Sequence, residues 1–211
     1  MTKTGLGGWE MRCFLQKIGR VRAKLASEGA AGAVLSTPDN IFYATGFSSV
    51  MDGWHLVEPI AAVFVPTAAA SPVLLILPEA SVISPIVSAR GGHPVHFDRL
   101  ATFDMLNFCE TARAEDAHLA LPKDLLAELG GLMELVESQC EPDIIQTIAA
   151  SLSRHVAQGE LILFDDLRVA ARVEALTGQA SGDAIDVMFA ARAVKTCLLY
   201  TSDAADEITG V

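Results

Sequence analysis

The sequence lacks an apolar run long enough to cross a membrane. Its strongest apolar stretches, such as PVLLILP at 72–78, are far shorter than the about 20 residues that a bilayer-spanning helix requires. The first residues, MTKTGLGGWEMRC, also lack the apolar core of a secretory signal peptide. These two absences favour a cytoplasmic protein with no membrane partner.

Cysteine and positive charge are scarce as well. The four cysteines are scattered and form no CxxC pair, which favours reduced thiols: Cys13, Cys109, Cys140 and Cys197. The 15 Lys and Arg are outnumbered by 26 Asp and Glu, which gives a formal net charge of −11 spread along the chain. A nucleic acid or an anionic membrane would need a basic face, so the composition argues against either partner.

What the chain does contain is enough apolar sequence for one packed domain. Hydrophobic residues make up 51% of its 211 residues, and no repeat or low-complexity linker divides them. Predicted strands alternate with predicted helices, and the strands are continuous apolar runs of the kind found in sheets covered on both faces. The sequence therefore predicts an α/β fold, a three-layer arrangement in which a mixed sheet has helices on both faces.

The predicted elements follow from apolar spacing and from the positions of proline and glycine. A helix near the N-terminus has an inward stripe formed by Met11, Leu15, Ile18, Val21 and Leu25. We expect strands at 31–36, 58–66, 71–78, 93–97, 117–122 and 160–164, and helices at 41–47, 79–92, 101–113 and 123–137, with 143–196 otherwise mostly helical.

Few side chains suggest catalytic chemistry. His93 and His96 are three residues apart on a predicted strand, so they would point to opposite faces and could not bind one metal ion together. Asp165 and Asp166 precede a predicted helix, where helix capping explains them better than acid–base catalysis. The residues alone therefore predict neither a catalytic group nor a metal site.

Two segments resemble one enzyme family. Between 36 and 49 the sequence STPDNIFYATGFSS carries proline, asparagine, tyrosine and glycine at spacings similar to those of the N-terminal domain of the creatinase, prolidase and aminopeptidase P family, the pita-bread metallohydrolases. The matching residues are Pro38, Asn40, Ile41, Tyr43, Thr45, Gly46 and Phe47. FAARAVKT at 189–196 resembles the segment that leads into that family's catalytic half. The stretch 140–185 looks longer and more helical than the family's usual connector.

The resemblance implies a ribonuclease-H-like N-terminal domain over 11–196, preceded by a disordered segment 1–10. It also implies a parent protein that is a cytoplasmic, homodimeric Xaa-Pro aminopeptidase or prolidase-like metallopeptidase. Such a parent would hold two divalent metal ions, manganese, cobalt or zinc, and would act on peptides. Their ligands would come after Lys195, so this domain would be non-catalytic, without a metal or cofactor, and would shape substrate access and oligomer contacts.

The last residues depart from the family. Cys197–Glu207 is similar to the translation of a transposon adaptor used in sequencing libraries, and it stands where the family's catalytic half would begin. We therefore expect 197–211 to be an artefactual tail and the gene to be truncated.

One loop remains a candidate contact site. Trp54 and His55 lie in the predicted turn 48–58, near the edge where the family's N-terminal domain overhangs the active site of another subunit. We expect them to contact substrate or a second subunit. The alternative is that Trp54 packs on the sheet edge and His55 is solvated.

Two other functions fit the same N-terminal domain. The parent could be a creatinase-like hydrolase acting on a non-peptide substrate, or a relative that lacks metals and binds peptides or histones. The residues that distinguish these functions would lie in the catalytic half.

Overall fold

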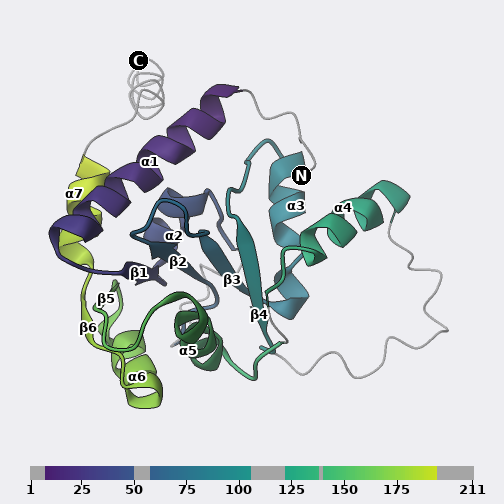
Figure 1. Cartoon of the computed structure of the whole chain (residues 1–211). Coiled ribbons are helices and arrows are strands. Elements are labelled where there is room, and N and C mark those ends of the chain that lie inside the picture. Colours follow the sequence, from purple (N-terminus) through teal and green to yellow (C-terminus); the bar gives the residue numbers. More distant parts are fainter. Residues whose placement is uncertain (1–7, 50–57, 106–121, 138–139, 194–211) are drawn as a thin grey trace, which may run out of the picture.

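The chain forms one sheet with helices on both faces (Figure 1). The computed structural model describes residues 8–49, 58–105, 122–137 and 140–193. The helices are α1 (Gly8–Ser27), α2 (Pro38–Thr45), α3 (Ser84–Arg90), α4 (Lys123–Met133), α5 (Ile144–His155), α6 (Leu167–Thr177) and α7 (Ile185–Ala193), with a 3₁₀ turn, η2, at Glu79–Ser81. The strands are β1 (Gly32–Leu35), β2 (Ala62–Pro66), β3 (Leu74–Pro78), β4 (Arg99–Phe103), β5 (Ile162–Phe164) and β6 (Ser181–Asp183).

The sheet is mixed, and its six strands have the order β4-β3-β2-β1-β5-β6. Only β2 runs against its neighbours; it is antiparallel to both β1 and β3, whereas β1 with β5, β5 with β6 and β3 with β4 are parallel. The carboxyl ends of the other five strands and the amino end of β2 therefore lie along one edge. We call it the carboxyl edge; Ser36, Asp104 and Asp165 directly follow β1, β4 and β5 there.

Two apolar clusters hold the layers together. Helices α1, α2, α3, α4 and α7 contribute to the cluster on one face, and α5 and α6 contribute to the cluster on the other. Successive strand residues alternate between the clusters, as the two-residue period of a strand requires: Ala33 and Leu35 belong to the first and Val34 to the second. All three are fully buried. The predicted three-layer α/β fold is confirmed.

The predicted strand 93–97 is wrong, and so is the start of the predicted helix 101–113, whose residues 106–113 lie outside the described residues. Residues 93–97 are irregular, and the peptide N–H of His96 donates to the Thr45 carbonyl at 2.8 Å instead of pairing within the sheet. The strand in this region is β4, which pairs in parallel with β3 and includes the first three residues of the predicted helix. The helical spacing of apolar residues here is overridden by pairing with β3, because that pairing buries four of the five residues of β4. The predicted strand 117–122 falls outside the described residues except for its last position.

The first helix also differs from its predicted inward stripe. Ile18 and the two later members are buried, but Met11 is 40% exposed and Leu15 is 57% exposed. Phe14 packs against the core in their place and stacks on the His96 ring at 4.7 Å. Helix α1 begins at Gly8, before the predicted domain boundary. None of the described helices combines the length and the hydropathy that crossing a membrane would require.

Candidate functional site

The residues predicted to contact substrate or a second subunit, Trp54 and His55, lie outside the described residues. His93 is exposed in the irregular segment before β4, and His96 is engaged with Phe14, so the two do not form a pair of metal ligands. Across residues 8–49, 58–105, 122–137 and 140–193, no three His, Cys, Asp or Glu side chains are grouped so that they could hold a metal ion. The described residues therefore do not fit the metal pair that the family resemblance implies for the parent.

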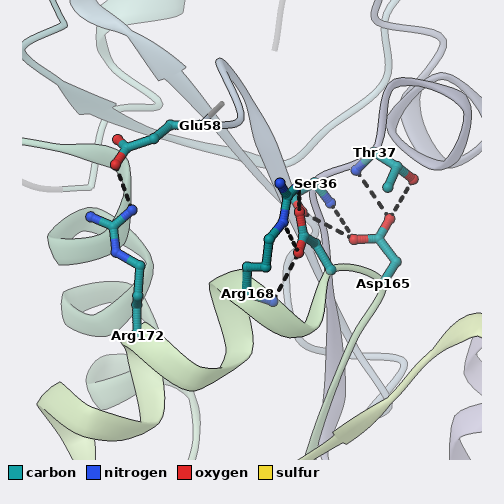
Figure 2. Close-up of polar contacts among 7 residues, drawn as sticks. Ser36, Thr37, Glu58, Asp165, Arg168 and Arg172 are labelled. Carbon is teal, nitrogen blue, oxygen red and sulfur yellow. Dashed lines mark hydrogen bonds and ion pairs between the residues drawn. The ribbon is translucent and has the colours of Figure 1, made fainter. Parts of the chain in front are cut away.

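The most densely bonded polar group at the carboxyl edge is the Asp165 carboxylate (Figure 2). Its Oδ1 accepts from the peptide N–H of Ser36 at 2.7 Å and from the Ser36 hydroxyl at 3.1 Å. Its Oδ2 accepts from the peptide N–H of Thr37 at 3.1 Å, the Thr37 hydroxyl at 2.6 Å and the Asn40 amide at 2.9 Å. The end of β5 is thereby joined to the turn between β1 and α2.

This arrangement makes Asp165 a structural residue. The side chain is 9% exposed and its two oxygens accept all five of these hydrogen bonds. A buried carboxylate is stabilised when such donors surround it, and little acceptor capacity remains for a ligand. The predicted capping role is therefore wrong for Asp165, which binds the start of a distant helix instead of α6.

The predicted capping role is confirmed for Asp166. Its carboxylate accepts from the peptide N–H of Arg168 at 2.9 Å and so caps α6. The Arg168 guanidinium lies 2.7 Å from the same carboxylate, and its hydrogen bonds are the main reason that the pKa of Asp166 is lowered. Two adjacent aspartates thus have different functions, because successive side chains at the end of a strand point in different directions.

A second set of contacts continues from Asn40 to the last described helix. The Asn40 amide oxygen accepts from Arg192 Nη1 at 3.1 Å, and Arg192 Nη2 lies 3.4 Å from the Asp39 carboxylate. The Tyr43 hydroxyl donates to the Ala191 carbonyl at 2.8 Å. We call these five residues, Asp39, Asn40, Tyr43, Ala191 and Arg192, the α2–α7 contact. It joins the two segments on which the family resemblance rests, although about 150 residues separate them in sequence.

Helix α1 supports the same contact from its other side. The Lys17 ammonium lies 5.4 Å from the centroid of the Tyr43 ring, a cation–π distance. Burial raises the pKa of the Tyr43 hydroxyl, and nearby Arg20 and Arg192 partly oppose that rise. Burial also lowers the pKa of Lys17. The phenol therefore stays protonated at neutral pH and can serve as the hydrogen-bond donor to α7.

Glycine at the end of α2 fixes how closely this helix approaches its surroundings. Gly46 has φ +77°, in the left-handed region, and its N–H donates to the Phe42 carbonyl. A Cβ at this position would lie 2.6 Å from the Pro94 carbonyl oxygen, so a larger residue would force a backbone to move.

The described residues also form two open grooves. One, of about 520 Å³, runs between α5 and α6 and is lined by residues that include Gln146 and Arg172. The other, of about 410 Å³, is lined by residues that include Glu58 and Met105. The Arg172 guanidinium on α6 lies 2.6 Å from the carboxylate of Glu58, which belongs to the segment before β2 (Figure 2). This ion pair joins α6 to that segment. The predicted contact loop, with Trp54 and His55, joins the described chain at Glu58.

Residues 17–82 match the model of the creatinase/prolidase N-terminal domain. None of the curated protein sequences matches the chain. The matched segment includes the STPDNIFYATGF motif and ends after η2, so the sequence resemblance is confirmed there.

Solved structures similar to this chain include a dipeptidase, an Xaa-Pro aminopeptidase and a prolidase. The dipeptidase PepE from Mycobacterium ulcerans has a TM-score of 0.50 and 15% identity, over 89% of this chain and 38% of that chain. The Xaa-Pro aminopeptidase from Streptococcus thermophilus has a TM-score of 0.49 and 14% identity, over 85% of this chain and 98% of that chain. The prolidase from Thermococcus sibiricus has a TM-score of 0.47 and 13% identity, over 83% of this chain and 35% of that chain. The chain thus spans about a third of the T. sibiricus prolidase, and at such identities the likeness concerns the fold alone.

Proposed function

We propose that the chain is the non-catalytic N-terminal domain of an Xaa-Pro aminopeptidase or prolidase-like metallopeptidase, because residues 17–82 match the model of the creatinase/prolidase N-terminal domain and the fold of the described chain is similar to that of the M. ulcerans dipeptidase. The parent protein would cleave peptides with two divalent metal ions held after Lys195. The domain would shape access to that active site and contribute to the contacts of a cytoplasmic homodimer.

The observation that supports this function best is the α2–α7 contact. Tyr43 and Asn40 fix the backbone and the side chain of the last turn of α7, at Ala191 and Arg192. Helix α7 also packs against α1, and its Met188 is buried in the apolar cluster to which α1 contributes. A polypeptide continuing from α7 would therefore leave a rigid scaffold in a defined direction, as a domain that positions a neighbouring active site requires.

The carboxylates of the domain support a positioning function over a catalytic one. Hydrolysis of a peptide near neutral pH needs an activated water, and metal ions supply one by lowering the pKa of bound water to about 7. Asp165 accepts five hydrogen bonds and Asp166 is bonded to α6, so neither is available for such chemistry. Trp54 and His55 remain our candidates for the substrate or subunit contact.

The test compares this chain with the parent protein translated from an uninterrupted gene through and past Lys195. Both are purified and assayed with Xaa-Pro peptides in manganese, cobalt or zinc. We expect no turnover by the chain and metal-dependent turnover by the parent. Turnover by the chain alone would overturn the non-catalytic function.

Matched variants of the parent then test the positioning function. R192A removes the side chain that contacts α2, whereas R168A removes an exposed arginine that contacts only the cap of α6. We expect R192A to lower kcat/KM by as much as about a hundredfold, the cost of misplacing reacting groups by about 1 Å, and R168A to leave it unchanged. Equal effects of the two variants would contradict the proposal.

The two alternatives predict different results in the same assay. A creatinase-like parent would hydrolyse guanidino compounds instead of Xaa-Pro peptides. A binding protein without metals would retain peptides in an equilibrium binding measurement but release no product.

A further inference from the structure

Helix α7 presents two large apolar side chains to solvent beside the α2–α7 contact. Phe189 is 75% exposed, the highest value among the large hydrophobic residues that the structure describes, and Ile185 is 56% exposed. They are four residues apart, so they lie on one side of the helix. On α2, Phe42 is 52% exposed.

An ion pair joins the two helices that carry these side chains. Arg192 follows Phe189 by three residues and contacts Asp39, which precedes Phe42 by three residues. Phe189 and Phe42 are therefore each about one helical turn from a member of the ion pair, and Ile185 is one turn further along α7. We call Phe42, Ile185, Phe189 and this ion pair the junction patch.

The patch lies on a rigid support. The opposite side of α7 is buried through Val187, Met188 and Ala191. Large apolar side chains around an arginine, on a backbone that needs no rearrangement, have the composition typical of the centre of a protein–protein interface. Single exposed apolar residues are ordinary, but two such residues one turn apart on the same short helix suggest a partner.

We propose that the junction patch is the docking surface for the polypeptide that follows residue 196 in the parent protein. This inference rests on the proposed function. Its support is the position of the patch on α7, the last described element, which ends at Ala193. In the M. ulcerans dipeptidase, a domain of this fold accounts for 38% of the chain, so most of such a protein lies outside it. A domain tethered at the end of α7 meets the patch at high effective concentration, which favours docking within one chain over docking of a second copy.

The test measures the same double variant in two proteins. I185S/F189S is introduced into the 211-residue chain and into the parent, and Tm is measured for each. L167S/L176S is the matched control, because it removes two leucines of α6 that are 55% and 60% exposed and lie away from the patch.

In the 211-residue chain we expect I185S/F189S to change Tm by less than about 2 °C, since both side chains are already exposed. In the parent we expect the same substitutions to lower Tm by at least about 4 °C, because they would remove buried apolar surface. The control should leave both proteins unchanged. An unaltered Tm of the parent would overturn the proposal.

Two further measurements complete the test. If the double variant of the parent does not fold, F189A is used instead, and cleavage by trypsin after Lys195 should be several-fold faster than in the unmodified parent; an equal cleavage rate would overturn the docking inference. Sedimentation equilibrium of the 211-residue chain tests the other occupant: self-association that disappears in I185S/F189S would assign the patch to a second copy and also overturn the proposal.

The outcomes for docking and for function are separable. If the parent lacks peptidase activity but its Tm falls in I185S/F189S and not in the control, the docking inference stands and the proposed function is refuted. If the parent is active but its Tm does not change with these substitutions, the proposed function stands and the docking inference is refuted.

Discussion

Replacing Asp165 with asparagine should destabilise the domain much more than the same change at its neighbour Asp166. The two oxygens of the Asp165 carboxylate accept two and three hydrogen bonds respectively, and both peptide N–H donors belong to the turn before α2. Asparagine has nearly the same shape but only one acceptor oxygen. It therefore cannot accept from both groups of donors in either orientation of its amide.

The loss of stability in D165N can be worked out from the better of the two orientations of the asparagine amide, in which its nitrogen takes the place of Oδ1. The Ser36 hydroxyl can rotate and accept from that nitrogen, but the Ser36 peptide N–H cannot and is left facing another donor. A buried donor without a partner costs about 1–3 kcal/mol, and the three remaining hydrogen bonds weaken because they no longer end on a charge. We expect a total loss of about 3 kcal/mol, a large part of the about 5–15 kcal/mol that stabilises a typical domain.

Thermal and urea unfolding of D165N and D166N measure the difference. A loss of about 3 kcal/mol in a chain of this length lowers Tm by about 6–12 °C. D166N should lose little, because asparagine is as good an N-cap residue as aspartate and the Arg168 partner is largely exposed. Similar Tm values for D165N and D166N would refute the structural function that we assign to Asp165.

Two other substitutions and one pH measurement test local features of the fold. G46A should lower Tm more than G178A, because both glycines have positive φ but only at Gly46 would the new Cβ meet a backbone oxygen, at 2.6 Å; equal losses would contradict this. R22K should lower the free energy of unfolding in urea by about 1–2 kcal/mol, because the Arg22 guanidinium donates to three backbone carbonyls around the β2–β3 turn and an ammonium cannot reach all three. The control R12K, on the exposed side of α1, should cause no measurable loss. The pKa of Asp166 in the folded state lies below its ordinary value of 3.8, so the charged carboxylate stabilises the fold above pH 3.8, and this stabilisation disappears as the pH falls through the lowered pKa. The difference in unfolding free energy between the unmodified chain and D166N should therefore shrink between pH 7 and pH 3. A constant difference would argue against the ion pair.

The layers of the fold could be predicted because they depend on local patterns. Apolar runs at 31–36, 58–66 and 71–78 gave strands whose central residues, such as Val63 and Leu75, are fully buried. Proline and glycine also lie at element boundaries: Gly46 ends α2, and Pro85 lies in the first turn of α3, so the predicted helix 79–92 is divided into η2 and α3. Such signals depend on residues close together in sequence, so a sequence shows them directly.

The errors arose where a distant segment decided the structure. Residues 101–103 are spaced like part of a helix, but β3 offers them a parallel partner, and the strand that results is almost fully buried. Leu15 fits the helical stripe of α1 as well as Phe14 does, yet the position of the His96 ring selects Phe14 for the inward side. Neither choice can be made from apolar spacing alone.

The function of Asp165 could not be predicted for the same reason. Its position after an apolar strand and before a helix is typical of a capping residue, and its neighbour Asp166 does cap α6. What distinguishes Asp165 is that β5 pairs in parallel with β1, so the residues that follow these two strands meet at the carboxyl edge. The serine, threonine and asparagine after β1 are short donors suited to a carboxylate, but this is apparent only once the parallel pairing is known.

The contacts of Asn40 give the family motif a physical explanation. Its amide nitrogen donates to Asp165 and its amide oxygen accepts from Arg192, so one side chain joins the end of β5 to the last turn of α7. Only a group with both a donor and an acceptor can do this; aspartate would place a second carboxylate against Asp165, and leucine would remove the hydrogen bond that Asp165 and Arg192 each make to this side chain. The two bonds share one planar amide, so the positions of Asp165 and Arg192 are linked through α2. An asparagine at this position therefore couples the sheet to the helix from which we propose the catalytic half continues.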